Sequence, residues 1–266
     1  MDKFGFIGCG NMGYPMLQGV KNVFGPDFVV FTTASAERRE LIKKETGVSH
    51  VSDNASIVAS CKYIILAVKP QKYEEVFNEI KDYVTKDHIV ISIAVGFPIE
   101  NIKKSLGSFV RVVRAMPNTP ALVGEGMTGV CFSEDTFTEQ EKSIIDRFFC
   151  SFGRYEIFDE KLMDAVACAS GSSPAYVYMF IEALADSVVK YGIPRDKAYD
   201  LVSQTVLGAA KMVLETREHP GKLKDQVCSP GGTTIAGVAA LEENGFRNAV
   251  IKATDACYAK ANSMKK

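Results

Sequence analysis

Short apolar runs alternate with amphipathic stretches along the N-terminal part of the chain. The runs are rich in β-branched and aromatic residues and lie at Phe4–Gly8, Phe28–Thr32, Tyr63–Val68, Ile89–Ala94 and Phe109–Val113. Their lengths are typical of buried parallel strands, and the stretches between them are long enough for crossover helices. Repeated strand–helix–strand units of this kind predict an α/β fold with a doubly wound sheet.

Two more strands are predicted beyond this alternation, at Gly126–Phe132 and Arg154–Phe158. The segment between them has a helical pattern. Thr138 is a good N-cap with Glu141 three residues later, so we expect a helix from Thr138 to about Ser151.

The pattern changes after Asp159, where strand-like runs disappear and only helical periods remain. Gly192 and Pro194 separate the first two long helices. Four helices are predicted, at Ala175–Tyr191, Arg195–Thr216, Thr233–Glu243 and Phe246–Lys260. We therefore expect a doubly wound domain over residues 1–159 and an all-α domain over residues 160–266.

The helices Ala175–Tyr191 and Arg195–Thr216 carry apolar residues around most of their circumference. A small helical bundle cannot bury that much surface by itself. Burial within the helical domain is one explanation. We favour a homodimer built through this domain, with a higher oligomer of dimers also open.

Charge and cysteine content narrow the functional classes. The chain has 31 Lys plus Arg against 32 Asp plus Glu, so we expect no nucleic-acid partner. No apolar run approaches the roughly 20 residues of a membrane helix, and the N-terminal stretch lacks the features of a signal peptide. The 7 cysteines are scattered without a C-x-x-C pair, and the 3 histidines lie far apart. We therefore expect free thiols, no metal and a cytoplasmic protein without membrane contact.

A glycine-rich motif follows the first predicted strand. Gly8, Gly10 and Gly13 form G-x-G-x-x-G, in which the glycines permit a tight turn, approach of a pyrophosphate and close packing of the next helix. A plain glycine-rich turn is the alternative, but the strand before and the helix after favour a Rossmann-like dinucleotide site. Cofactor contacts are predicted for Ile7, Gly8, Gly10, Asn11, Met12 and Gly13.

The residues after the second strand bear on which dinucleotide binds. An NAD site usually has an acidic residue about 20 residues beyond the glycine loop, for the ribose 2′-hydroxyl. Here hydroxyl side chains up to Ser35 come first, followed by Glu37 and by Arg38 and Arg39. Ser35 and Arg38 therefore favour a 2′-phosphate and NADPH, with NADH possible. Either arginine could instead be solvated.

Several motifs further along the chain carry a family resemblance. They are AVKP at Ala67–Pro70, RAMPNTP at Arg114–Pro120, ASGSSPAY at Ala169–Tyr176 and VCSPGGTTIAG at Val227–Gly237. Together with the glycine loop, and in this order over essentially the whole chain, they closely resemble pyrroline-5-carboxylate reductase. That family reduces the cyclic imine 1-pyrroline-5-carboxylate to L-proline with NADPH or NADH, the last step of proline biosynthesis.

The SPGGTT segment suits a carboxylate ligand. Pro230 and the two glycines after it predict a loop whose backbone N–H groups point one way, and the helix that starts near Thr233 adds its positive end. Helix capping by Ser229 or Thr233 is the alternative. The resemblance implies that Thr234 is the catalytic residue and hydrogen-bonds the imine nitrogen. It also implies a substrate site formed by Ser229, Gly231, Gly232, Thr233 and Thr234.

Two positions depart from the family pattern. Gln226 stands where relatives often have Asn, and the resemblance implies a cofactor contact there. Ser173 replaces a glycine immediately before Pro174, and we expect it to adopt an extended conformation. Capping of the following helix is an alternative role for Ser172 and Ser173.

The resemblance implies four further contacts, each with a simpler alternative. Glu160 is expected at the substrate, although a carboxylate is favourable at any helix N-terminus. Val68, Lys69 and Pro70 are expected at the nicotinamide ribose, although Lys69 could be solvated. Asn54 is expected at the adenosine half of the cofactor, although it could cap a helix over Ala55–Ser60.

The expected reaction is hydride transfer from the nicotinamide to the imine carbon, which needs no strong general acid. Interleaved helical domains would let each active site draw on both subunits. One alternative is a β-hydroxyacid dehydrogenase-like oxidoreductase, but Ser172–Ile181 lacks the Lys-x-x-x-Asn pattern of those enzymes. The other alternative is a non-catalytic NADP-binding module.

Overall fold

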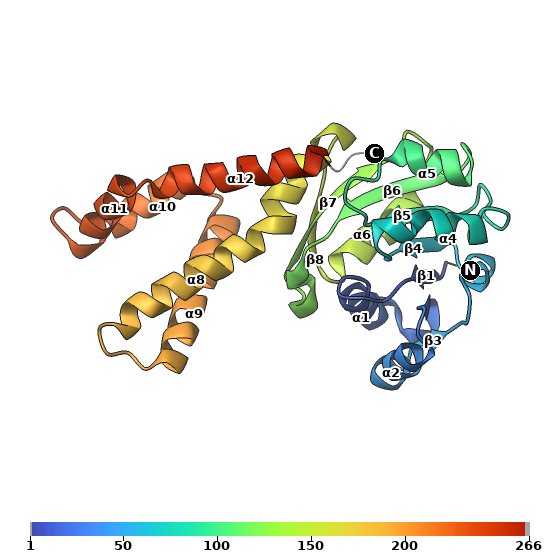
Figure 1. The fold of residues 1–266 in the computed structure, drawn as a ribbon, viewed down its shortest axis with the longest axis horizontal. Helices are drawn as coiled ribbons and strands as arrows, with labels where there is room; N and C mark the ends of the chain where they lie inside the picture. The colour runs from blue at the N-terminus through green and yellow to red at the C-terminus, as the bar shows by residue number, and fades with distance from the viewer. Residues whose placement is uncertain (1, 264–266) are drawn as a thin grey trace. The chain divides into compact units, whose positions relative to one another are not determined.

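The structure is a computed structural model that describes residues 2–263. The chain folds as two compact units (Figure 1). The first contains the chain up to Ser172 together with the C-terminal segment from Tyr258, and the second contains Ser173–Cys257.

An eight-stranded sheet with the order β3-β2-β1-β4-β5-β6-β7-β8 forms the centre of the first unit. All neighbours are parallel except β6 and β7, which are antiparallel. The strands are β1 (Phe4–Ile7), β2 (Val29–Thr32), β3 (Ser49–His50), β4 (Tyr63–Leu66), β5 (Ile89–Ser92), β6 (Arg111–Met116), β7 (Gly126–Phe132) and β8 (Gly153–Ile157). The predicted doubly wound sheet is confirmed. The two-residue strand β3 was not predicted.

Helices cover both faces of this sheet (Figure 1). One face packs against α1 (Gly13–Phe24), α2 (Ala36–Thr46) and α6 (Glu139–Cys150), and the other against α3 (Asn54–Ser60), α4 (Tyr73–Ile80), α5 (Ile99–Leu106) and α7 (Met163–Val166). The predicted N-cap of α6 is confirmed, because Thr138 and Glu141 form a complete capping box. Burial of strand side chains on both faces explains why the strands are continuous apolar runs.

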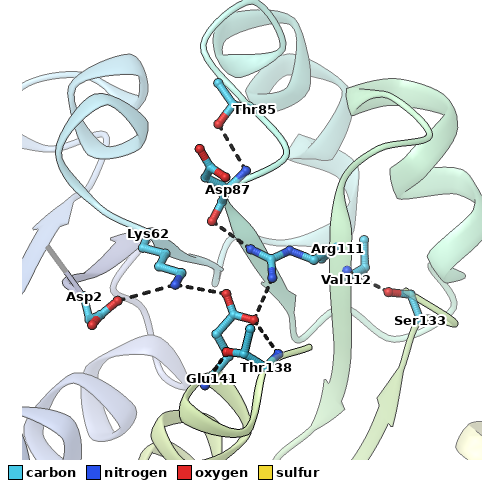
Figure 2. Close-up of polar contacts among 9 residues, drawn as sticks. All are labelled: Asp2, Lys62, Thr85, Asp87, Arg111, Val112, Ser133, Thr138 and Glu141. Carbon is cyan, nitrogen blue, oxygen red and sulfur yellow. Dashed lines mark hydrogen bonds and ion pairs between the residues drawn. The ribbon is translucent and has the colours of Figure 1, made fainter. Parts of the chain in front are cut away.

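A buried carboxylate ties the amino ends of several strands to α6 (Figure 2). Glu141 is 3 % exposed and accepts a hydrogen bond from Arg111 at 2.7 Å, at the start of β6. Lys62, just before β4, lies 2.9 Å from its other oxygen. Burial raises the pKa of Glu141, but the hydrogen bonds from Arg111, the Thr138 backbone and Lys62 outweigh it and lower the pKa to about 2. The cluster therefore keeps an ionised carboxylate inside the fold.

The regular secondary structure of the second unit, Ser173–Cys257, is all helical. It contains α8 (Ser173–Val189), α9 (Arg195–Thr216), α10 (Pro220–Val227), α11 (Thr233–Glu243) and the first part of α12 (Phe246–Ser263). The predicted bounds of α9 and α11 are confirmed, whereas α10 was not predicted. A π-helix over Ala167–Ser172 runs directly into α8.

The expected extended conformation at Ser173 is wrong. Ser173 is helical, because the chain enters α8 from a preceding helical turn and does not begin a new helix there. Proline disfavours but does not forbid a helical residue before it. Pro174 has no N–H for the carbonyl four residues earlier, and that carbonyl oxygen, Ser170 O, accepts from Asn118 Nδ2 at 3.0 Å instead.

The core of the second unit is small. Its buried apolar residues are Ala185, Ala198 and Val202, with a ring of partly buried neighbours. Many large apolar side chains on its helices stay exposed within one chain, among them Met179, Leu207, Met212, Leu241 and Ile251. A groove of about 480 Å³ between α8, α11 and α12 is lined almost wholly by apolar residues. A single chain thus leaves unburied the surface that the sequence assigns to a dimer interface.

Within residues 2–263, no helix is long and apolar enough to cross a membrane, and no group of three or more His, Cys, Asp or Glu side chains could hold a metal ion. All 7 cysteines are free thiols.

Candidate cofactor and substrate site

The carboxyl end of β1 is the point where the strand order reverses. β1 lies between β2 and β4, and the later strands follow on the β4 side. The Gly8 N–H donates to Thr32 O at 3.0 Å, and the Ala67 N–H donates to Ile7 O at 2.8 Å. The loops that follow three neighbouring strands therefore meet at one edge, which is where open α/β sheets bind dinucleotides.

The three glycines of the loop after β1 differ in what a side chain at each position would meet. Gly8 has φ +92°, and a Cβ there would lie 2.7 Å from the Val68 side chain. A Cβ on Gly13 would lie 2.8 Å from Gly8 O, so α1 packs directly on the turn. A Cβ on Gly10 would meet no atom within 4 Å, so it faces open space.

That open space lies beside the start of α1. The N-cap of α1 is Met12, which makes no side-chain capping hydrogen bond, so no side chain of the cap covers the start of the helix. Asn11 is exposed beside it, and Ile7 is buried at the end of β1. The Tyr14 N–H is used inside the loop, where it donates to Gly10 O at 3.0 Å, and Pro15 has no N–H. The positive end of α1, without a side-chain cap and next to a glycine without a side chain, can still attract an anion. The glycine-loop residues expected at the cofactor therefore lie together.

The structure distinguishes the two arginines that follow β2. Arg39 donates to the carbonyl oxygen of Thr33 and so stabilises the turn between β2 and α2. The Arg38 guanidinium lies over the Tyr14 ring, 5.3 Å from its centroid. Within residues 2–263 the Arg38 side chain has no hydrogen-bond acceptor or ion-pair partner. Arg38 is the arginine with free donors beside the glycine loop.

Ser35 is the N-cap of α2. Its hydroxyl oxygen accepts from the Arg38 N–H at 3.1 Å, and its O–H donates to Glu37 Oε2 at 2.6 Å. Ser35 and Arg38 therefore share one short turn, as a 2′-phosphate site requires. The acidic Glu37 reaches into the same turn.

The residues expected at the two ends of the cofactor follow β4 and begin α3, at the same edge of the sheet. Val68, Lys69 and Pro70 follow β4, and Val68 touches the position of Gly8. Asn54 donates to Glu79 Oε2 at 2.6 Å. Its alternative role as a helix cap is wrong, because Asp53 caps α3 through the Ser56 N–H at 2.7 Å.

Glu160 is anchored through one carboxylate oxygen. Oε1 accepts from the Ile99 N–H at 2.8 Å and from Arg114 Nη1 at 3.1 Å. Arg114 is 4 % exposed, and its Nη2 lies 3.9 Å from Asp164. Glu160 thus caps α5 and pairs with a buried arginine.

Asn118 and Arg114 were not chosen from the sequence, although both lie in the RAMPNTP motif. Asn118 is buried, accepts from the Met127 N–H at 2.8 Å and donates to Ser170 O at 3.0 Å. It ties the loop after β6 to the π-helix that leads into α8. The signal available in the sequence was Arg114, a charged residue directly after the apolar pair Val112–Val113.

The SPGGTT loop belongs to the second unit. Gly231 has φ +68°, and the Gly232 N–H donates to Ser229 O at 3.0 Å, which closes a tight turn before α11. The N-cap of α11 is Gly232, which has no side chain to accept a hydrogen bond. Capping by Ser229 or Thr233 is therefore wrong, and the first-turn N–H groups lack a side-chain cap. Thr233 and Thr234 are exposed in this turn, and Gln226 is exposed near the end of α10.

These groups can bind anions and orient a ligand, but they include no obvious acid–base pair. The thiol of Cys9, inside the glycine loop, is not a nucleophile, because burial raises its pKa to about 12. The chemistry fits a bound redox cofactor and a substrate with a carboxylate.

Two family models match the chain. The model described as pyrroline-5-carboxylate reductase dimerisation matches residues 160–264. The model described as NADP oxidoreductase coenzyme F420-dependent matches residues 3–96.

Curated relatives match over nearly the full length. The pyrroline-5-carboxylate reductase of Escherichia coli is 44% identical, with 99% of this chain and 98% of the relative covered. The enzyme of Methanosarcina acetivorans is 41% identical, with 95% and 96% covered.

Solved structures of the same family are also similar to this chain over its whole length. A pyrroline-5-carboxylate reductase from Coxiella burnetii superposes with a TM-score of 0.92 at 36% identity, with 100% of this chain and 99% of that chain covered. The pyrroline carboxylate reductase of Plasmodium falciparum, solved with NADP bound, has a TM-score of 0.88 at 35% identity, with 100% and 98% covered. Identity at this level over both whole chains places this protein in the pyrroline-5-carboxylate reductase family.

Proposed function

We propose that the protein reduces 1-pyrroline-5-carboxylate to L-proline with a nicotinamide cofactor, the last step of proline biosynthesis. The observation that carries this is the SPGGTT loop: a tight glycine turn, an α11 N-terminus without a side-chain cap, and two threonine hydroxyls in its first turn. That set suits a small ligand with a carboxylate next to a nitrogen. Membership of the family supports the same activity.

The cofactor is NADPH, and NADH is the weaker alternative. The glycine loop from Ile7 to Gly13 would hold the pyrophosphate through backbone N–H groups and the positive end of α1. Ser35 and Arg38 would hold the 2′-phosphate, Asn54 the adenosine half, and Val68, Lys69 and Pro70 the nicotinamide ribose. The free guanidinium donors of Arg38 support this assignment. Gln226 is the remaining cofactor contact that we propose.

The bound cofactor supplies the hydride, and the chain supplies position and charge. We assign the carboxylate of the substrate to the backbone N–H groups at Gly231 and Gly232 and to Thr233, with Ser229 beside them. Thr234 would hold the imine nitrogen, which fixes the face of the C=N bond that is open to attack. A protonated imine is already electrophilic, so orientation by a hydroxyl is sufficient. Glu160 would contact the substrate with the oxygen that Arg114 and Ile99 leave free.

The protein forms a homodimer through its helical part. We propose that each active site draws on both subunits, because catalysis requires the residues of the two units around one cofactor. Co-expression of two variants expected to be inactive, Gly10→Asp and Gly232→Asp, tests this. The first places a carboxylate in the proposed pyrophosphate site, and the second places one in the proposed site of the substrate carboxylate. Mixed dimers then contain one site with both defects and one intact site, and random pairing predicts recovery of about a quarter of wild-type activity. Recovery of none would show that each site is built within one chain.

We further propose a higher oligomer of such dimers and a cytoplasmic location. The free state of all 7 cysteines supports a reducing compartment. We also keep the functional division into a cofactor domain over residues 1–159 and a dimerisation and substrate domain over residues 160–266. The pyrroline-5-carboxylate reductase dimerisation model, which starts at residue 160, supports this boundary.

One assay separates the proposed activity from its alternatives. Purified protein is given NADPH and 1-pyrroline-5-carboxylate, and in parallel NADP⁺ and a panel of 3-hydroxy acids. Cofactor oxidation with proline formation supports the proposal. Turnover of a hydroxy acid would indicate a β-hydroxyacid dehydrogenase-like enzyme. Binding of NADPH without any turnover would indicate a non-catalytic module.

A further inference from the structure

Tyr14 lies between the glycine loop and the predicted 2′-phosphate site. It is the second residue of α1, directly after Gly13, and its ring lies under the Arg38 guanidinium at 5.3 Å. An aromatic face attracts a guanidinium and leaves its in-plane N–H donors open to an acceptor. The ring thus fixes the arginine while leaving its donors available.

The phenol of Tyr14 is itself held on both sides. Its O–H donates to Glu45 Oε2 at 2.8 Å, on α2, and its oxygen accepts from Gln18 Nε2 at 3.0 Å, one turn further along α1. Burial and the hydrogen bond to Glu45 raise the pKa of Tyr14, so the ring stays neutral at physiological pH. The ring is therefore oriented before any ligand arrives.

Arg38 has little else to hold it. Within residues 2–263 its guanidinium makes no hydrogen bond or ion pair, whereas the neighbouring Arg39 is tied to Thr33 O. A long side chain without a partner loses rotamer freedom when it binds a ligand, and that loss weakens binding. A surface that already restricts the side chain reduces this loss.

We propose that Tyr14 is a positioning residue that sets cofactor specificity, because it holds Arg38 as the receptor for the 2′-phosphate of NADPH. The inference rests on the proposed function only in that NADPH is the cofactor. Tyr14 itself needs no contact with the cofactor. Its effect should appear in NADPH binding and not in NADH binding, since NADH lacks the 2′-phosphate.

The test is cofactor binding without substrate, so it is independent of the proposed reaction. The chain has 0 tryptophans, so titration can follow the fluorescence of the reduced nicotinamide without overlap from indole emission. Tyr14→Leu should raise the Kd for NADPH about three- to tenfold and change the Kd for NADH less than twofold. Tyr14→Phe, which keeps the ring, should have a smaller effect. Arg39→Gln is the matched control and should leave the ratio of the two Kd values unchanged.

A double-mutant cycle separates positioning from general packing. If Tyr14 acts through Arg38, Tyr14→Leu in an Arg38→Gln background should change the Kd for NADPH less than twofold. Adenosine 2′,5′-bisphosphate should report the same pattern by calorimetry, since it carries the 2′-phosphate without the nicotinamide. Tyr14→Met replaces Tyr14→Leu if circular dichroism shows that the leucine variant does not fold.

Three results would overturn the inference. Equal losses for NADPH and NADH would mean that Tyr14 supports α1 or the glycine loop. Additive effects in the cycle would mean that Tyr14 and Arg38 act separately. An unchanged Kd for NADPH in Arg38→Gln would show that Arg38 does not bind the 2′-phosphate. None of these results bears on the proposed reductase activity. That proposal is refuted only if proline is not formed.

Discussion

The Ser35 hydroxyl donates a hydrogen bond of 2.6 Å to the carboxylate of Glu37, in the turn that leads into α2. This hydrogen bond is the main cause of the lowered pKa of Glu37, so the carboxylate is charged at neutral pH. A 2′-phosphate that approaches Ser35 would meet that charge and would compete for the same hydroxyl proton. We therefore expect Glu37 to oppose Arg38 in the choice of cofactor.

Replacing Glu37 should shift the cofactor preference towards NADPH. Glu37→Gln removes the charge and releases the Ser35 hydroxyl, so the Kd for NADPH should fall about two- to fivefold relative to that for NADH. Titration of both cofactors measures the ratio. Glu40→Gln, one turn further along α2, is the control. A ratio that stays the same or falls would show that Glu37 does not face the 2′ position.

Thr234→Ala tests the substrate loop. Loss of the hydroxyl proposed to hold the imine nitrogen should weaken transition-state stabilisation by about 1–3 kcal/mol. This corresponds to a roughly 5- to 150-fold reduction of kcat/KM. The Kd for NADPH and the melting temperature should not change. The control is Thr254→Ala, whose hydroxyl only back-bonds to Val250 O within α12 at 3.1 Å. If Thr234→Ala retains wild-type kcat/KM, the residue has another role.

A charge on the exposed apolar face of α9 should break the dimer. The sequence suggests Val206→Glu, but Val206 also packs against the small core of the second unit. Leu207 is 54% exposed in one chain, so Leu207→Glu separates dimer loss from unfolding more cleanly. Sedimentation at micromolar concentration should show a monomer that has lost its activity, while Lys197→Glu on the same helix stays dimeric. An active monomer would contradict the proposed role of the dimer in catalysis.

Glu141 should make the stability depend on pH. Its pKa is about 2 in the folded protein and near 4.5 when unfolded, so its contribution is present above pH 4.5 and is lost as the pH falls towards 2. Glu141→Gln should lower the free energy of unfolding at pH 7 by about 3 kcal/mol, since it leaves Arg111 without its ion-pair partner. The difference in Tm from wild type should shrink between pH 7 and pH 3. Glu139→Gln, an exposed position in the same helix, should have little effect at either pH, and a pH-independent difference for Glu141→Gln would exclude this linkage.

The fold was largely predictable because most elements have clear local signals. Gly192 and Pro194 delimit the start of α9, and the glycine pair before Thr233 delimits α11, so both helices match their predicted bounds. α10 was missed because eight residues with few apolar positions give no usable period. β3 was missed because two polar residues form a strand only when β2 offers them an edge.

The site was predictable in outline but not in its polar contacts. Both arginines after Ser35 look alike in the sequence. Only the fold shows that Arg39 reaches Thr33 O while Arg38 lies over Tyr14. Likewise, the partners of Glu160 come from β6 and from the start of α5, far from it in the sequence. Contacts between distant segments depend on the register of the whole sheet, which no local motif encodes.

The most direct test of the proposed activity follows the hydride itself. The protein is incubated with 1-pyrroline-5-carboxylate and NADPH that carries deuterium at the transferred position of the nicotinamide, and the product is analysed by mass spectrometry. We predict L-proline that carries one deuterium at the former imine carbon, formed in equal amount to the NADPH consumed. No proline from folded, dimeric protein with either NADPH or NADH, or proline without deuterium, would contradict the proposed reaction.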